Sequence, residues 1–261
     1  MLELIRNRLR QGMGTLAFPR GPAPDFPERF RGRPTRDPVR CPEDCRACRG
    51  RAPSALLVDG PDGRTALDVG ACLFSPEEAE ACPAGAIAYS RDYRMAARTR
   101  DGLVQPSGGG EVELARALDE RSRRLFGRSL RLRSVVAGSC NGCEAELVAL
   151  GNVVFDLARF GVQFVASPRH ADGIVITGAI NVNMRLALQK TYEAVPAPKI
   201  VLAVGACAVS GGPFRGSPEV SNGVPAEIPV DLWIAGCPPH PLTILDGVLR
   251  VLGLIEGGRA G

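Results

Sequence analysis

Four cysteines in the second half of the chain have a spacing that suits metal ligation; they are Cys140, Cys143, Cys207 and Cys237. Each is preceded by glycine, either directly or with one small residue between them. Glycine allows tight turns and a close approach of the backbone, which an inorganic cluster that accepts N–H contacts requires. We therefore expect these four thiols to hold one [4Fe–4S] cluster.

A second group of cysteines lies upstream in two runs that are similar to the motif of bacterial two-cluster ferredoxins. That motif is C-x2-C-x2-C-x3-C-P, and the fourth cysteine of each run binds the cluster of the other run. The second run keeps Cys72 and Cys82 but has Ser75 and Glu78 at its middle positions. The first run has Ala52 at its fourth position and one inserted residue, and it keeps Cys41, Cys45 and Cys48.

Exchanging the fourth ligands between the runs leaves one complete site and one incomplete site. The complete set is Cys41, Cys45, Cys48 and Cys82. The other set combines Cys72 with serine, glutamate and alanine, which cannot hold a stable [4Fe–4S] cluster. The register predicts a one-cluster ferredoxin-like domain in which Cys72 is a leftover thiol. Loss of both clusters, or a zinc ion in their place, are the alternatives.

The elements that must position the first four cysteines alternate between strands and helices. Apolar, β-branched runs predict strands at 131–137, 162–167, 172–178, 199–205 and 230–235, and apolar periodicity predicts helices at 144–160, 183–195 and 241–255. This alternation predicts an α/β domain with a flavodoxin-like, doubly wound parallel sheet. The four cysteines follow the first, fourth and fifth strands, at the edge where such sheets bind ligands.

Composition divides the chain into four parts. Residues 1–40 form a Pro/Arg-rich docking segment, and 41–104 form the small α+β ferredoxin-like domain. Residues 105–129 comprise a glycine-rich linker and a helix predicted over Glu111 to Phe126, and 130–261 form the sheet domain.

The 261-residue chain has 45% hydrophobic and 23% charged residues, as is normal for globular proteins. No apolar run reaches the roughly 18–20 residues that cross a bilayer, and the N-terminus does not have the features of a secretory signal. We therefore expect a cytoplasmic protein, in which the nine cysteines are metal ligands rather than disulfides. Aromatic residues are too scarce for a base-stacking surface, so nucleic acid is not expected as a partner.

Other metal chemistry is weighed against the cluster. A structural zinc site with four cysteines usually pairs two C-x-x-C units, and here only Cys140 and Cys143 have that spacing. A thioredoxin-like redox pair at those two residues would leave Cys207 and Cys237 unexplained. Buried cysteines that act only as small apolar residues would not all follow strands.

The segments GSCNGCEAEL, VGACAVSGG and GCPPHP, within roughly residues 130–255, resemble the small subunit of [NiFe]-hydrogenases. The resemblance is to the membrane-bound, energy-converting group that includes formate hydrogenlyase and the hydrogenase-4 type. The chain is also similar to the 20 kDa subunit of respiratory complex I. In that subunit the first two ligands are adjacent, so the spacing Cys140-x-x-Cys143 favours the hydrogenase branch.

The resemblance implies a function and a set of partners. Electrons would pass through [4Fe–4S] clusters to or from a separate large catalytic subunit, and the chain alone would be inactive. Membrane subunits and other iron–sulfur subunits would hold it at the cytoplasmic face of the inner membrane. The resemblance also places a glutamate at the position of Glu146 near the cluster, which implies proton transfer, whereas helix capping is the simpler role.

The N-terminal stretch GTLAFPRGPAPDFPERFRGRP resembles the start of the ferredoxin subunit in the same complexes, so the chain looks like a fusion of two subunits. Two rival functions stay open. One is a quinone-reducing, complex-I-like (NADH:quinone oxidoreductase) module. The other is a zinc-stabilised interaction module without redox activity.

Overall fold

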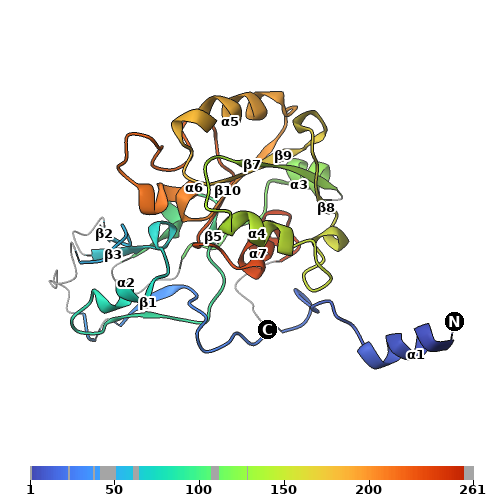
Figure 1. Cartoon of the computed structure of the whole chain (residues 1–261), viewed down its shortest axis with the longest axis horizontal. Coiled ribbons are helices and arrows are strands. Elements are labelled where there is room, and N and C mark those ends of the chain that lie inside the picture. Colours follow the sequence, from blue (N-terminus) through green and yellow to red (C-terminus); the bar gives the residue numbers. More distant parts are fainter. Residues whose placement is uncertain are drawn as a thin grey trace.

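A six-stranded sheet forms the centre of the computed structural model, which describes residues 2–22, 24–37, 39–41, 51–60, 65–106, 112–127 and 129–255 (Figure 1). The strands are β7 (Leu130–Val136), β8 (Val162–Phe164), β9 (Gly173–Thr177), β10 (Ile200–Val204), β11 (Leu232–Ile234) and β5 (Ala96–Ala97). Their order is β8-β7-β9-β10-β11-β5, with β5 the antiparallel member. The five parallel strands thus have the order 2-1-3-4-5, and the predicted flavodoxin-like arrangement is confirmed.

Helices cover both faces of this sheet. They are α3 (Glu120–Phe126), α4 (Gly142–Ala149), α5 (Val182–Ala194), α6 (Ala206–Ser210) and α7 (Pro241–Val251). Helix α5 lies over one face, and α4 and α7 lie over the other (Figure 1). All residues of β9 and β10 are buried, because strands between two helical layers have no face in water.

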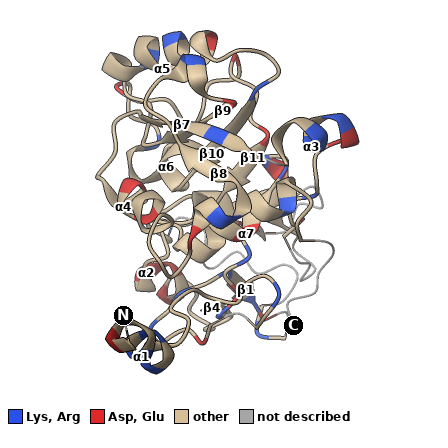
Figure 2. Cartoon of the chain, turned by 90° about the vertical axis from the view of Figure 1, so that its right-hand side faces the viewer, with Lys and Arg blue, Asp and Glu red and all other residues tan. Residues whose placement is uncertain are grey.

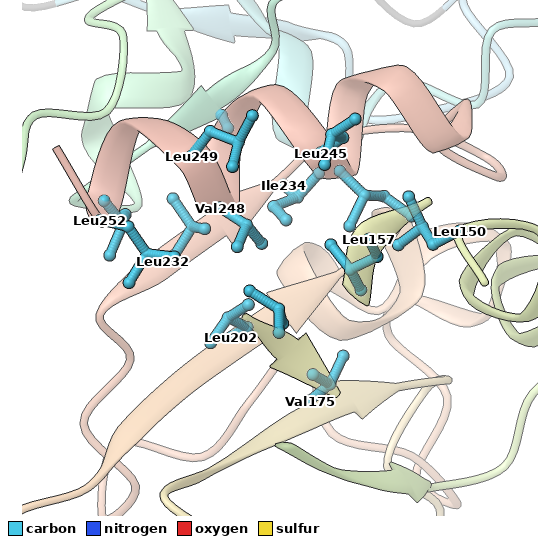
Figure 3. Packing of buried hydrophobic residues seen from close by; sticks show 14 of the residues in the cluster. Leu150, Leu157, Val175, Leu202, Leu232, Ile234, Leu245, Val248, Leu249 and Leu252 are labelled. Atoms are coloured by element: carbon cyan, nitrogen blue, oxygen red, sulfur yellow. The ribbon is translucent and has the colours of Figure 1, made fainter. Parts of the chain in front are cut away.

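Helix α7 is buried along its whole length and supplies much of the core. On this side the packed residues are Leu245, Val248 and Leu249 of the helix and Leu252 directly after it. They pack against Leu232 and Ile234 of β11 and Leu202 of β10 (Figure 3). The helix also contains a buried ion pair, in which Arg250 Nε donates to Asp246 Oδ2 at 2.8 Å. This pairing satisfies two charges that burial would otherwise destabilise.

Three predicted helices are shorter than the periodicity indicated, and one of them, α7, ends at Val251 rather than at residue 255. Helix α4 ends at Ala149, and the chain then turns, with Asn152 Oδ1 accepting from the backbone N–H of Val154 at 2.8 Å. A 3₁₀ turn, η3 (Leu157–Phe160), replaces the end of the predicted helix. The prediction over 144–160 was therefore wrong beyond residue 149.

In the region predicted to be helical from Glu111 to Phe126, only α3 is a helix. The preceding residues are extended, although Val112, Ala115 and Leu118 are buried at helical spacing. Their backbone bonds go to distant segments: Ala115 N–H donates to Ala96 O at 2.7 Å, and Leu118 N–H donates to Val251 O at 2.9 Å. Long-range pairing thus overrides the local pattern.

The region upstream of the sheet contains two small antiparallel groups of strands. Strand β1 (Pro34–Arg36) pairs with β4 (Ile87–Tyr89), and β3 (Thr65–Asp68) pairs with β2 (Leu57–Asp59) and β6 (Val104–Gln105). The short helices of this region are α2 (Pro76–Glu80) and the 3₁₀ turns η1 (Val69–Ala71) and η2 (Asp101–Leu103). Two further 3₁₀ turns lie downstream, η4 (Pro168–His170) and η5 (Gly212–Phe214). The apolar core of this region includes Val209 and Ala235 of the sheet region.

The Pro/Arg-rich segment packs along the sheet region. Arg159 donates to the carbonyl oxygens of Leu16 and Phe18 at 2.8 and 2.7 Å. Phe26 and Phe30 stack, with ring centroids 4.1 Å apart, and pack against the main core. The segment predicted to dock therefore contacts this chain's own core.

Helix α1 (Leu2–Gln11) precedes this segment and extends away from the rest of the chain (Figure 1). Basic and acidic residues both occur along it (Figure 2). None of its residues is buried. Within the described ranges, no helix is both long enough and apolar enough to cross a bilayer.

The core predicts a large difference between two leucine truncations. Leu245 on α7 is 0% exposed, whereas Leu186 on α5 is 63% exposed. We expect Leu245→Ala to lower the free energy of unfolding by about 2–5 kcal/mol, because it removes packed methyl groups and leaves a cavity. Leu186→Ala should change it by less than about 0.5 kcal/mol. Denaturant unfolding followed by circular dichroism measures both, and equal losses would contradict the core assignment.

Candidate metal centre

The structure brings the four downstream cysteines together at the carboxyl edge of the sheet. Cys140 lies in the loop after β7, and Cys143 lies in the first turn of α4. Cys207 lies in the first turn of α6, and Cys237 lies in the loop after β11, separated from it by Ala235 and Gly236. The thiols of Cys143, Cys207 and Cys237 each lie close enough to other thiols of the group for charges on them to repel.

Glycines allow the backbone to approach the sulfurs. Gly205 has φ +90°, and a Cβ at this position would collide with Cys143 Sγ. A Cβ at Gly212, which has φ +55°, would lie 2.8 Å from Cys207 Sγ. Because these two residues have no side chain, there is free space next to the sulfur atoms. Any other residue at either position would fill that space. Gly205 was among the glycines that the sequence singled out, whereas Gly212, which follows Cys207, was not.

Three of the thiols, those of Cys143, Cys207 and Cys237, have an environment that disfavours their ionisation. Burial raises the pKa of Cys207 to about 11, and repulsion from Cys237 and Cys140 contributes in the same direction. Burial also raises the pKa of Cys143 and of Cys237, again with contributions from neighbouring thiols. Bound iron would counter this repulsion with positive charge, because metals bind cysteine as the thiolate.

The donor set therefore fits a cluster with one thiolate on each iron. A single ion needs its donors much closer together, since all of them bond to one centre. Among the described residues, no group of three or more His, Cys, Asp or Glu side chains is arranged to hold one metal ion.

Glu144 ties the first cysteine loop to the sheet. Its Oε2 accepts a hydrogen bond from Ser139 Oγ at 2.6 Å, and its Oε1 accepts from Thr177 Oγ1 at the end of β9. The sequence suggested only a capping role for this residue. In the sequence, the feature that pointed to this contact is Thr177, a polar residue at the end of a strand. Its partner Glu144 depends on where α4 lies in the folded chain.

Glu146 and His240 line a cavity of about 370 Å³ that also contacts Cys237. Burial raises the pKa of Glu146, so its neutral form is favoured relative to an exposed carboxyl. Burial lowers the pKa of His240, whose Nδ1 accepts from Leu242 N–H at 3.1 Å. His240 thus caps α7.

Sequence reasoning missed the N-terminal wall of this cavity. Arg29, Phe30 and Arg31 line it. The ring of Phe30 meets that of His240 edge-on, with centroids 5.7 Å apart. The Pro/Arg composition gave no indication of which residues would face the cysteines. A larger cavity of about 500 Å³, between α5 and residues 221–228, contains none of the predicted site residues.

The upstream ligand set is only partly described. Cys41 and Cys82 contribute to the same apolar cluster, and Cys82 Sγ accepts from Ala86 N–H at 3.3 Å. Cys45 and Cys48 lie outside the described residues. The four-cysteine set at this position stays a prediction.

The fold and the site define a class: α/β proteins with a doubly wound sheet that gather thiols at the ligand edge. The sequence profile of the NADH ubiquinone oxidoreductase 20 kDa subunit family matches residues 140–251, which contain all four downstream cysteines. A probable membrane-bound hydrogenase subunit of Pyrococcus furiosus is 43% identical over 129 residues, which are 49% of this chain and 77% of that protein. The chain belongs to this family of oxidoreductase subunits, and the resemblance seen in the cysteine motifs is confirmed.

Two further relatives represent the two branches considered from the sequence. Formate hydrogenlyase subunit 7 of Escherichia coli is 43% identical over 129 residues, 49% of this chain and 51% of that protein. A subunit of the NADH-quinone oxidoreductase of Heliobacterium modesticaldum is 46% identical over 115 residues, 44% of this chain and 66% of that protein. The chain thus spans about half the length of the first of these two relatives.

The Glu144 contacts predict how the cysteine loop responds to mutation. We expect Glu144→Ala to speed hydrogen exchange of residues 138–145 by about tenfold, the effect of losing one charge-assisted hydrogen bond. Thr177→Val should have a similar effect because it removes the other end of one bond. Glu193→Ala on the exposed side of α5 is the control and should leave this loop unchanged. Unchanged protection in Glu144→Ala would show that the carboxylate does not hold the loop.

Proposed function

We propose that this chain is an electron-transfer subunit of a membrane-associated [NiFe]-hydrogenase-like complex. In this proposal Cys140, Cys143, Cys207 and Cys237 hold a [4Fe–4S] cluster, which when bound accepts and releases one electron. The observation that carries the proposal is the convergence of four thiols at one sheet edge, with glycine backbone against two of them.

The chain's own residues would bind and shield this centre. The cysteine loops supply the ligands, and Glu144 fixes one of these loops to β9 through Thr177. Phe26 and Phe30 pack edge-on against the ring of His240, three residues after Cys237, while the Cys237 side chain itself is exposed. Burial of such a centre is one of the factors that set its reduction potential.

The upstream region is proposed to be a ferredoxin-like domain with a second cluster on Cys41, Cys45, Cys48 and Cys82. The strand pairs support this, because β1 precedes the first cysteine run and pairs with β4, which follows the second. Electrons would then pass between a partner and the large subunit by way of both centres. The division at residues 41–104 and 130–261 belongs to the same proposal.

The expected partners are a large catalytic subunit, membrane subunits and other iron–sulfur subunits. The hydrogenase and formate hydrogenlyase names of two relatives support this assignment. Contact with the membrane would then be peripheral, at the cytoplasmic face and through partner subunits. We also propose that Glu146 exchanges protons beside the centre, supported by its place in the cavity with Cys237 and by its raised pKa.

A quinone-reducing module is the second candidate, and its support is the similarity to a NADH-quinone oxidoreductase subunit. The co-purified large subunit distinguishes the two. Two C-x-x-C pairs in that subunit, one near each end, would indicate a nickel site. Their absence would favour quinone or another acceptor.

Iron analysis of cysteine variants tests the ligand assignment. We expect anaerobically purified protein to contain iron and acid-labile sulfide in equal amounts, and reduction to give an EPR signal. Cys207→Ala or Cys237→Ala should lose about four irons per chain, since each removes one ligand of a [4Fe–4S] cluster. Cys72→Ala is the matched control and should keep all of its iron.

Three outcomes would contradict the proposal. Iron and sulfide near zero would exclude the cluster. Stoichiometric zinc without an EPR signal would support an interaction module stabilised by zinc. A loss of about four irons in Cys72→Ala would show that the upstream register was assigned wrongly.

A further inference from the structure

Glu78 is a glutamate with 0% exposure, and backbone groups bind both of its oxygens. Leu73 N–H donates to Oε1 at 2.9 Å, and Ser75 N–H donates to Oε2 at 3.1 Å. The Ser75 contact is the usual reach of a capping glutamate back to the start of its helix. The Leu73 contact lies outside that motif, so capping explains only part of the site.

Three side chains complete the surroundings of this carboxylate. Tyr89 OH lies 2.8 Å from Oε2, and Cys72 Sγ lies 3.1 Å from the same oxygen. Ser54 Oγ donates to Oε1. All five neighbouring groups can donate, which suits a carboxylate that only accepts; Tyr89 OH also lies 2.9 Å from Ser75 O, and its one proton serves one acceptor at a time.

Cys72 acts in this network as a protonated thiol. Burial raises its pKa well above the usual range, and the charge of Glu78 adds to the effect. A thiol in this state donates a hydrogen bond to the carboxylate. Cys72 is thus part of the hydrogen-bonded core.

The network occupies the positions of the missing cluster ligands. In the ferredoxin register, Cys72, Ser75 and Glu78 stand at the first three cysteine positions of the second run, and Ala52 stands at the crossed fourth position. Ser54 is only two residues beyond Ala52 in the chain. A cluster held there would accept N–H contacts from the surrounding loop, and the carboxylate accepts such contacts instead.

We propose that the Glu78 carboxylate replaces the second ferredoxin cluster, gathering the loop donors around a buried negative charge and keeping this loop folded without iron. The inference rests on the one-cluster register of the proposed function. A buried carboxylate with this many donors is stabilised where an unpaired one would not be.

The same charge lies close to the downstream centre. Phe74, two residues after Cys72, lines the cavity that contains Cys237, and it shares an apolar cluster with Ala235. A fixed negative charge beside a redox centre disfavours its reduction. Removing this charge, as in Glu78→Gln, would therefore raise the reduction potential of a cluster held by Cys237.

The test compares Glu78→Gln with Glu77→Gln in the full-length protein, reconstituted anaerobically. Glu77 is exposed on the same helix, so its variant makes the same charge change; its carboxylate interacts with the Ser75 side chain and not with the groups that donate to Glu78. Glu78→Gln should speed limited proteolysis between residues 51 and 90 by about tenfold, since it points an amide N–H₂ at groups that donate. Its iron content should stay unchanged, and an EPR titration should show a higher potential for the downstream centre.

Two further variants keep the proposal falsifiable if Glu78→Gln fails to fold. Tyr89→Phe removes one donor and should accelerate proteolysis to a smaller extent. The combination of Ala52→Cys, Ser75→Cys and Glu78→Cys should gain about four irons, because it restores all four ligands with Cys72.

The outcomes separate this proposal from the proposed function. Equal proteolysis and equal potential in the Glu78→Gln and Glu77→Gln proteins would overturn the replacement, as would no gain of iron in the triple variant. Loss of iron in Cys72→Ala would instead overturn the upstream register on which the inference rests.

Discussion

Four thiols at one edge of a parallel sheet repel one another once they ionise. The structure around them holds the cysteine loops together in spite of that repulsion. The parallel order of β7, β10 and β11 brings three separate loops to the same edge. Glycines at positions 205 and 212 allow the backbone to come close to the sulfurs, and Glu144 holds one loop to β9. The sheet can maintain this arrangement because it is packed between helices, with α7 fully buried against one face.

The upstream part of the chain is integrated with this edge at several points. Strand β5 extends the central sheet beside β11, and η1 packs against α6, which carries Cys207. Arg100 forms a bidentate pair with Asp68 and also donates to Val209 O at 3.1 Å. These contacts place the upstream region that contains Cys72 and Cys82 against the part of the sheet domain that carries Cys207.

The Glu78 network illustrates how a buried polar group can stand where a metal cluster is expected. A cluster and a carboxylate are both anionic when bound in this way, and both accept hydrogen bonds from the surrounding backbone. Replacing the cluster with a carboxylate removes the electron carrier at this position. The carboxylate still needs hydrogen-bond donors from the surrounding backbone. The folded loop can therefore persist after its ligands have changed.

The sequence by itself determined the class of fold and the family. The β-branched runs and intervening amphipathic segments predicted the doubly wound sheet, because strand and helix periods are local properties of the chain. The cysteine motifs identified the family and the candidate ligands for the same reason, although their ligation of a cluster stays a prediction. The upstream four-cysteine set also stays a prediction, since Cys45 and Cys48 are outside the described residues.

Only the tertiary structure decided which groups surround those residues. The segment before α3 is extended because its backbone pairs with Ala96 and Val251, and these partners are distant in sequence. Likewise, the contact of Glu144 with Thr177 and the enclosure of Glu78 depend on how separate segments pack. The sequence could show that Cys72 had lost its companion ligands. Long-range packing was needed to show that the remaining thiol, a tyrosine and a serine surround a buried carboxylate in their place.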